Sequence, residues 1–185
     1  MRDSFHSYPP KTLFLRAFKQ EKELEVWAGT RKLRLIKTFP ILAASGVLGP
    51  KLQRGDRQVP EGWYHIDRFN PKSRFHLSLG LNYPNEADQI RSAGRDPGSD
   101  IFIHGSNVSI GCLAMGNPAI EEIYGVARDM KTRIQVVILP SRRIDPKTEL
   151  DNQLKGINDT FETKHFVPKV RINRFGAYEI TPLDE

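Results

Sequence analysis

Hydrophobic and polar positions alternate along much of the chain with the period of two that is typical of β-strands. Leu13 and Leu15 share one face of the first segment, Leu24 and Val26 share one face of the next, and a turn at residues 29–31 precedes further alternation. The stretch from about residue 12 to 38 is therefore predicted to form antiparallel strands joined by hairpins. The same pattern predicts further strands over residues 63–68, 74–79, 101–104 and 133–139.

Glycine and proline interrupt this pattern over residues 45–62, where four glycines and two prolines predict a loop over a sheet edge. One helix start is clear, because Asn117 can act as N-cap and Pro118 suits the first helical position. The apolar residues that follow keep helical spacing; they are Ile120, Ile123, Tyr124 and Ala127. A second helix is predicted near residues 146–154. The predicted fold class is mainly β with one or two helices.

The length of 185 residues suits a single domain at about 150 residues per domain. We assign residues 11–185 to this domain and residues 1–10, which end in Pro9-Pro10, to an extended N-terminal arm. No apolar run approaches the roughly 18 to 20 residues of a membrane-spanning helix, so no membrane span is expected. The first residues lack the apolar core of a secretory signal. The protein is thus expected either to be cytoplasmic or to be a mature chain.

Composition narrows the function classes only slightly. Lys and Arg number 28 against 22 for Asp and Glu, and the net charge of +6 favours anionic partners such as nucleic acid, anionic lipid or an acidic polymer. No nucleic-acid-binding motif accompanies this charge, so nucleic acid is not an expected partner. Cys112 is the only cysteine, which excludes an intrachain disulfide, a CxxC redox pair and a zinc site with several cysteines.

The segment around this cysteine carries the most specific chemistry. His104 lies at the end of a predicted strand, and Cys112 follows Gly111 eight residues later, across a polar turn. Thiolate is the reactive form of cysteine and a nearby imidazole can remove the thiol proton, so we expect a Cys112 pKa below about 8.5. Gly111 lets the backbone approach a substrate carbonyl, so the Cys112 amide could stabilise an oxyanion. Ser106 and Ser109 offer hydroxyl groups to the same cavity.

Other interpretations of these residues stay open on composition and spacing alone. A lone cysteine is more often a small buried hydrophobic residue than a nucleophile, and a histidine at a strand end is more often structural than catalytic. A zinc site formed by Cys112, His104 and His76 would lack any recognised ligand spacing. No metal site is therefore assigned.

The same segment also resembles a known family. His104-Gly105, followed by Ser109-Ile110-Gly111-Cys112, resembles the HG…S-x-G-C active-site pattern of the L,D-transpeptidase catalytic domain, also called the YkuD domain. Cys112-Leu113-Ala114-Met115 and the short loop after His104 look like the YafK-type branch of this family. Better-known members have a branched aliphatic residue and an arginine in place of Leu113-Ala114, and many have a second histidine in place of Ile110.

The resemblance implies a β-sandwich catalytic domain that acts on peptidoglycan stem peptides and needs no cofactor. Cys112 would attack the amide carbonyl next to a diaminopimelate residue and form a thioester, with His104 as the base. The Cys112 amide and the Gly111 region would stabilise the oxyanion, and the Gly105 carbonyl would orient the imidazole. An amine acceptor would resolve the thioester by transpeptidation, and water would resolve it by hydrolysis.

Three alternatives and a location accompany this interpretation. The YafK-type resemblance makes hydrolytic release of a wall-linked lipoprotein a rival to transpeptidation, hydrolytic trimming of stem peptides is a second alternative, and a non-catalytic wall-binding module is a third. By resemblance, the protein is expected in the periplasm or cell envelope. Arg74 and His76 alternate on the predicted strand over residues 74–79, so both could meet a substrate carboxylate. Tyr83, Ser106 and Ser109 complete the expected substrate-binding residues.

Overall fold

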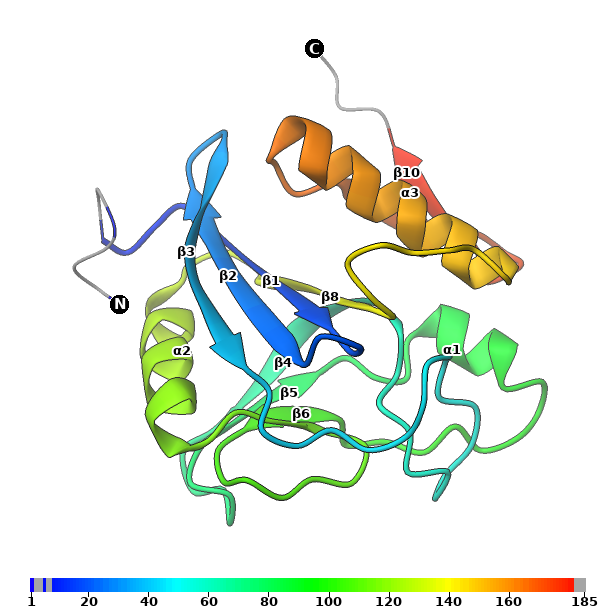
Figure 1. The fold of residues 1–185 in the computed structure, drawn as a ribbon, viewed down its shortest axis with the longest axis horizontal. Helices are drawn as coiled ribbons and strands as arrows, with labels where there is room; N and C mark the ends of the chain where they lie inside the picture. Colours follow the sequence, from blue (N-terminus) through cyan, green and yellow to red (C-terminus); the bar gives the residue numbers. More distant parts are fainter. Residues whose placement is uncertain (2–4, 6–7, 182–185) are drawn as a thin grey trace.

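The computed structural model describes residues 1, 5 and 8–181, so residues 2–4 and 6–7 of the predicted N-terminal arm lie outside the described residues. The described part contains ten strands and three helices (Figure 1). In chain order they are β1 (Thr12–Phe18), β2 (Glu23–Gly29), β3 (Leu33–Pro40), β4 (Gly62–Asn70), β5 (Ser78–Leu81), α1 (Glu86–Arg91), β6 (Phe102–His104), β7 (Leu113–Ala114), α2 (Asn117–Asp129), β8 (Gln135–Leu139), α3 (Glu149–Lys164), β9 (Lys169–Ile172) and β10 (Tyr178–Thr181). The mainly β prediction is confirmed, with three helices in place of one or two.

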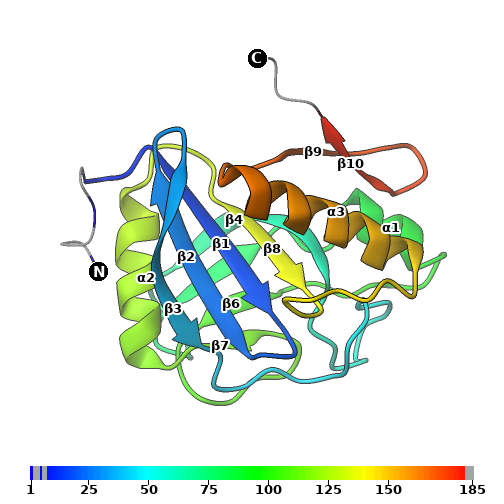
Figure 2. The ribbon, with the colours of Figure 1, turned by 45° about the horizontal axis from the view of Figure 1, so that its top comes forward.

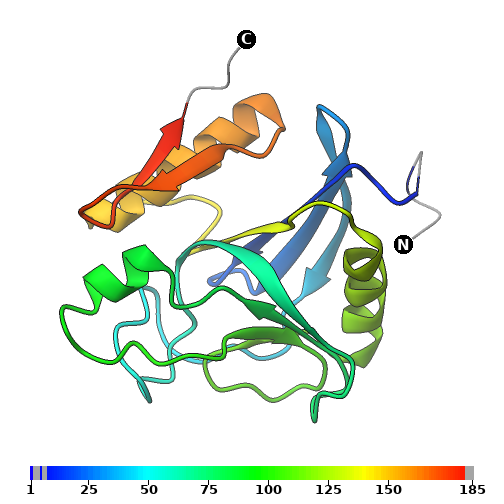
Figure 3. The ribbon, with the colours of Figure 1, turned by 180° about the vertical axis from the view of Figure 1, so that it is seen from behind.

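Eight of these strands form one curled sheet in the order β3-β2-β1-β8-β4-β5-β6-β7. β1 pairs with β8 in parallel and β6 pairs with β7 in parallel, whereas the other neighbours are antiparallel. Just after β3, Ala43 forms a bridge to Ala114 of β7, so the two ends of the strand order meet. The halves β1–β3 and β4–β7 therefore lie over each other like the layers of a sandwich (Figure 1, Figure 3).

Two hydrophobic cores stabilise these layers. The first lies between the two halves of the sheet and against α2, and includes Leu15, Ile103 and Ile123. The second lies on the other face of β1 and β8 beneath α3, where the ring of Phe14 packs 5.0 Å from that of Phe161 (Figure 2). β1 is buried on both faces because its alternate residues enter different cores.

The strand predicted over residues 74–79 is wrong along most of its length. β5 begins only at Ser78, and residues 73–77 form turns and bends. His76 has a φ of +73°, a left-handed conformation that interrupts the alternation of a strand. Arg74 and His76 therefore do not share a strand face, and the 73–77 segment crosses the sheet edge as a turn.

The helices also differ from prediction in their ends. Gly116, at a φ of +80°, is the N-cap of α2, because the Asn117 side chain accepts a hydrogen bond from the Ser106 amide instead of capping the helix. α3 continues to Lys164, well beyond residue 154, since its buried residues keep helical spacing along its whole length. α1 was not predicted, although Asn85 and Asp88 form a capping box at its start.

Candidate active site

The register of β6 and β7 places His104 and Cys112 on one face of the sheet. β6 and β7 run in parallel, with Ile103 opposite Leu113 and His104 opposite Ala114. Ile103 and Leu113 both enter the first core. Because side chains alternate along a strand, His104 and Cys112, which directly precedes β7, lie on the opposite face. Parallel pairing thus brings imidazole and thiol to the same side of the sheet.

The imidazole of His104 is held in a defined protonation state. Its Nδ1 lies 2.6 Å from the Gly105 carbonyl oxygen, and because a carbonyl only accepts, Nδ1 carries the proton and Nε2 keeps its lone pair. His104 is 2% exposed. Burial lowers its pKa, and the bond to Gly105 offsets only part of that effect. The imidazole is therefore neutral at pH 7, as a general base must be.

Gly105 is enclosed too tightly for any other residue. A Cβ at this position would lie 2.5 Å from the Phe75 carbonyl oxygen and 2.8 Å from Asn117 Oδ1. The Gly105 amide also donates to the Leu77 carbonyl oxygen at 3.1 Å. The backbone that orients His104 is thus fixed between the 73–77 turn and the start of α2, and the Phe75 ring stands 4.7 Å from the imidazole.

Cys112 is half-buried, and its sulfur is engaged by the backbone of the preceding segment. Sγ accepts from the Phe102 amide at 3.3 Å and donates to the Asp100 carbonyl oxygen at 3.5 Å. Burial raises the pKa of the thiol and the Asp100 carboxylate raises it further, outweighing the opposite effects of the Phe102 amide and Lys51. The expected pKa below about 8.5 is therefore wrong for the free protein. Thiol and imidazole are both neutral at pH 7.

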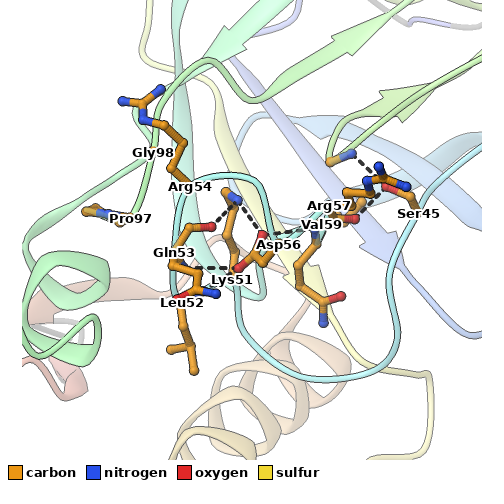
Figure 4. A network of polar contacts seen from close by, with 12 residues as sticks. Ser45, Lys51, Leu52, Gln53, Arg54, Asp56, Arg57, Val59, Pro97 and Gly98 are labelled. Atoms are coloured by element: carbon orange, nitrogen blue, oxygen red, sulfur yellow. Dashed lines mark hydrogen bonds and ion pairs between the residues drawn. The ribbon is translucent and has the colours of Figure 1, made fainter. Parts of the chain in front are cut away.

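The amides expected to stabilise an oxyanion are already bonded. The Cys112 amide donates to Ser109 Oγ at 3.1 Å, and that hydroxyl donates to the Cys112 carbonyl oxygen at 2.7 Å. The Gly111 amide donates to Ser45 Oγ at 2.7 Å. The Ser45 hydroxyl in turn donates to the Arg57 carbonyl oxygen at 2.6 Å (Figure 4). An oxyanion must therefore replace a serine hydroxyl as the acceptor of these N–H groups.

The long loop over residues 45–61 is ordered by its own polar contacts. Asp56 lies at the centre of this network and accepts from the Lys51 ammonium and from the amides of Leu52, Gln53 and Gln58 (Figure 4). Burial raises the pKa of Asp56, but these hydrogen bonds outweigh it and hold the pKa below its ordinary value. Because Ser45 belongs to the same loop, this network fixes the residue that bonds Gly111.

An open groove of about 550 Å³ lies where the 73–77 turn meets the start of α2, and neither His104 nor Cys112 lines it. It brings together three of the expected substrate-binding residues, Arg74, His76 and Ser106. The rest of its lining consists of Leu42, Phe75, Asn107, Gly116, Asn117 and Pro118. His76 Nε2 lies 2.6 Å from Glu121 Oε1 of α2, which ties the 73–77 turn to that helix.

The other expected substrate-binding residues lie elsewhere. Ser109 contacts the Cys112 backbone, as described above. Tyr83 is 4% exposed within the first core, where its hydroxyl donates to the Pro97 carbonyl oxygen at 2.9 Å. It therefore supports the 94–100 loop and does not line the groove.

The described residues contain no group of three or more His, Cys, Asp and Glu side chains placed to hold a metal ion. Within the same part of the chain, no helix combines the length and apolar character needed to cross a membrane.

Sequence reasoning missed several residues that contact His104, Cys112 or the neighbouring Gly111. Ser45 lies in a loop far from Cys112 in the sequence, and only the fold brings it to Gly111. Phe75 lies in a segment predicted as a strand, but it belongs to the 73–77 turn, which brings its ring to His104. Asp100 has a φ of +63°, which a sequence pattern does not reveal in a residue other than glycine.

Comparisons with known proteins show what the chain is similar to. The model of the family described as "L,D-transpeptidase catalytic domain" (YkuD) matches residues 16–138. A protein of Escherichia coli strain K12, named "Putative L,D-transpeptidase YafK", is 32% identical over 176 residues, covering 86% of this chain and 70% of that protein.

Two solved structures share the fold. A mutant of the helical cell shape determining protein Pgp2 from Campylobacter jejuni has a TM-score of 0.60 and 24% identity, over 84% of this chain and 56% of that one. Bd1075 of Bdellovibrio bacteriovorus has a TM-score of 0.54 and 22% identity, over 85% and 58% of the two chains. This chain spans little more than half the length of each.

Proposed function

Because the chain belongs to the family of L,D-transpeptidase catalytic domains, we propose that it is a cysteine enzyme that acts on peptidoglycan stem peptides through a thioester on Cys112. One observation carries the proposal. The Gly105 carbonyl holds the His104 proton on Nδ1, which leaves Nε2 able to accept a proton on the face of the sheet that also carries Cys112.

The first half of the reaction forms the thioester. Cys112 Sγ attacks the carbonyl carbon of an amide next to diaminopimelate, and its proton passes to His104 Nε2. The carbonyl oxygen becomes an oxyanion and takes the Cys112 N–H from Ser109 Oγ, because an anionic acceptor forms the stronger hydrogen bond. The C–N bond then breaks, and the leaving amine takes the proton from His104.

The second half releases the acyl group. His104 Nε2 removes a proton from an incoming amine or water, which attacks the thioester carbonyl. The C–S bond breaks, and Cys112 regains its proton from the imidazolium. An amine acceptor makes the reaction an L,D-transpeptidation; water makes it a hydrolysis that trims stem peptides or releases a wall-linked lipoprotein. Both outcomes need the same thioester.

The groove between the 73–77 turn and α2 suits part of the peptide. Arg74 is exposed and lines this groove, where its guanidinium can bind a substrate carboxylate, and Ser106 lines it as well. His76, paired with Glu121, shapes the wall of this groove. This proposal places the enzyme in the periplasm or cell envelope, where such peptides are found.

The test uses purified muropeptides of defined stem length, with and without an added D-amino acid as acceptor. We expect turnover by the wild type, none by Cys112→Ala or His104→Gln, and normal turnover by His65→Gln. His65 is a suitable control because it is another strand histidine whose pKa burial lowers. Mass spectrometry of the products separates transfer from hydrolysis. Full activity in folded Cys112→Ala would exclude the mechanism, whereas muropeptide binding with no turnover by the wild type would favour the non-catalytic wall-binding module.

A further inference from the structure

Arg68 and Asp100 form a charged site close to Cys112, and Arg68 lies in the row of paired residues that leads across the sheet to Cys112. Arg68 of β4 pairs with Gly80 of β5, and Gly80 pairs with Phe102 of β6. Phe102 in turn donates its amide to Cys112 Sγ. Neighbouring strands lie about 4.8 Å apart, so this row runs directly from Arg68 towards the nucleophile.

The side chain of Arg68 lies directly over Gly80, which has no side chain of its own. A Cβ at Gly80 would lie 2.8 Å from Arg68 Nε and 3.0 Å from Arg68 Cβ, so a larger residue would displace the side chain. The guanidinium carbon stands 5.0 Å from the centre of the Phe102 ring, within the range of a cation–π contact. The Arg68 side chain thus crosses β5, and its guanidinium group lies over Phe102 of β6, the strand next to Cys112.

A β-bulge helps to place this side chain. The register of β4 against β5 shifts between Ile66 and Arg68, so Asp67 is an extra residue. Bulges redirect side chains and are frequent beside active sites. Here the bulge puts the Asp67 carboxylate 3.1 Å from Arg68 Nε.

Asp100 completes the site. Its Oδ1 accepts from Arg68 Nη1 at 3.0 Å, and its backbone carbonyl is the group that Cys112 Sγ contacts. The Asp100 side chain is 63% exposed and that of Arg68 is 46% exposed. Hydrogen bonds from Ser99 and Arg68 hold the pKa of Asp100 below its ordinary value, so it is a carboxylate. Its left-handed backbone, φ +63°, is an unfavourable conformation of the kind that concentrates at functional sites.

The charges present here match a zwitterion better than an anion. One guanidinium faces two carboxylates, and within the described residues Arg68 Nη2 has no hydrogen-bond partner. A lone anion would be repelled by Asp67 and Asp100. A carbon that bears both an ammonium and a carboxylate can place its carboxylate on Arg68 and its ammonium on Asp100.

We propose that Arg68 and Asp100 bind a zwitterionic amino-acid terminus of the substrate, beside the carbonyl that Cys112 attacks. The inference rests on the proposed function, in which the substrate contains diaminopimelate. The far end of that side chain is such a terminus, separated by three methylene groups from the carbon next to the attacked carbonyl. A lysine side chain has the ammonium alone. Arg68 and Asp100 therefore make the enzyme specific for the diamino diacid.

The experiment compares three stem tetrapeptides that differ only in the third residue: diaminopimelate, its side-chain amide, and lysine. We expect the wild type to have a kcat/KM for diaminopimelate at least about tenfold above those for the amide and lysine peptides. Arg68→Gln removes this preference, since it lowers kcat/KM for diaminopimelate and leaves the lysine peptide nearly unchanged. Asp100→Asn lowers kcat/KM for all three peptides, because each of them carries the ammonium.

Two further variants make the outcome clear. Arg171→Gln removes another exposed arginine that pairs with a carboxylate, Glu179, and keeps the wild-type preference. Arg68→Lys retains the charge without the planar fork, so its preference is intermediate. If Arg68 has only a structural role, Arg68→Gln lowers kcat/KM for all three peptides by the same factor. Equal wild-type activity on the three peptides, or an unchanged preference in Arg68→Gln, overturns the inference.

Binding separates this inference from the proposed function. The Cys112→Ala protein is titrated with the same peptides by calorimetry, with and without Arg68→Gln. Arg68-dependent binding of the diaminopimelate peptide together with no wild-type turnover contradicts the proposed function alone. Turnover that depends on Cys112 but ignores the third residue contradicts the inference alone.

Discussion

Ser109 and Cys112 are joined twice through one hydroxyl group, which accepts from the Cys112 amide at 3.1 Å and donates to the Cys112 carbonyl at 2.7 Å. This pair holds the turn that carries the nucleophile and occupies the amide that an oxyanion needs. We therefore expect Ser109 to position Cys112, in place of the substrate-binding role that the sequence suggested.

Replacing Ser109 by alanine tests this assignment. Loss of the two bonds is expected to lower the stability by about 1 kcal/mol and to lower kcat more than it raises KM, because the turn no longer holds Cys112 in place. Ser109→Thr keeps the hydroxyl and restores kcat. Steady-state kinetics and thermal unfolding measure both effects. A change in KM alone would instead assign Ser109 to substrate binding.

The protonation states of the pair predict a particular pH dependence. Burial raises the pKa of Cys112 and lowers that of His104. Alkylation of Cys112 by iodoacetamide in the free enzyme should therefore increase with pH through a midpoint above the ordinary thiol value of about 8.5. The acid limb of kcat/KM, where His104 gains a proton, should have its midpoint below the ordinary value of about 6.5.

An ion pair in the free enzyme would have a different profile. A thiolate stabilised by an imidazolium would be alkylated rapidly even at pH 5 to 6, as in cysteine enzymes with a strongly lowered thiol pKa. Rapid alkylation at such acid pH would contradict a neutral pair, which is what burial of both groups favours.

Gly105→Ala tests the backbone that orients the imidazole. The new Cβ would meet the Phe75 carbonyl oxygen at 2.5 Å and Asn117 Oδ1 at 2.8 Å, so we expect a loss of about 1–3 kcal/mol and a strongly reduced kcat. Gly125→Ala on α2 is the matched control, because no atom beyond its chain neighbours and the backbone of its own helix lies within 4 Å of its Cβ position and alanine favours a helix interior by roughly 0.5–1 kcal/mol. Unfolding curves in which both variants behave alike would contradict the steric argument.

Beneath the 45–61 loop, Glu61 forms a buried ion pair with Lys19 at 2.9 Å. Burial lowers the Lys19 pKa, and Glu61 opposes that shift. Glu61→Ala leaves the ammonium buried without its counterion, so we expect a loss of about 3–5 kcal/mol in denaturant titrations. Lys155→Ala breaks an exposed pair with Asp159 and should cost less than about 0.5 kcal/mol. Similar losses of unfolding free energy in the two variants would contradict a stabilising role of the buried Lys19–Glu61 pair.

The sequence predicts those parts of the fold that depend on local periodicity. The β1–β3 meander and the strands β4, β6 and β8 follow from alternation, and the apolar spacing after Pro118 predicts α2. Residues 74–79 resemble a strand in the same way, but the left-handed backbone at His76 ends that pattern. The turn that forms instead contacts residues distant in sequence, because Phe75 packs against His104 and His76 pairs with Glu121 of α2.

The residues of the candidate site also differ in whether the sequence alone can identify them. His104, Gly105 and Cys112 can be identified because their motif is local. Ser45 and Arg68 cannot, since Ser45 reaches Gly111 from another loop and Arg68 reaches Phe102 only because Gly80 leaves a path across β5. The unusual environment of the thiol also depends on the fold, because its pKa follows from burial and from Asp100.

The thioester on Cys112 is the central claim, and the mass of the intact protein tests it most directly. The wild type is mixed with a defined disaccharide tetrapeptide, quenched in acid and examined by mass spectrometry. We expect an adduct equal in mass to the substrate minus its leaving amine, mapped to Cys112, lost on treatment with hydroxylamine and missing in Cys112→Ala. Product formation by the wild type at full rate with no adduct at any time, and equally in Cys112→Ala, would contradict the account.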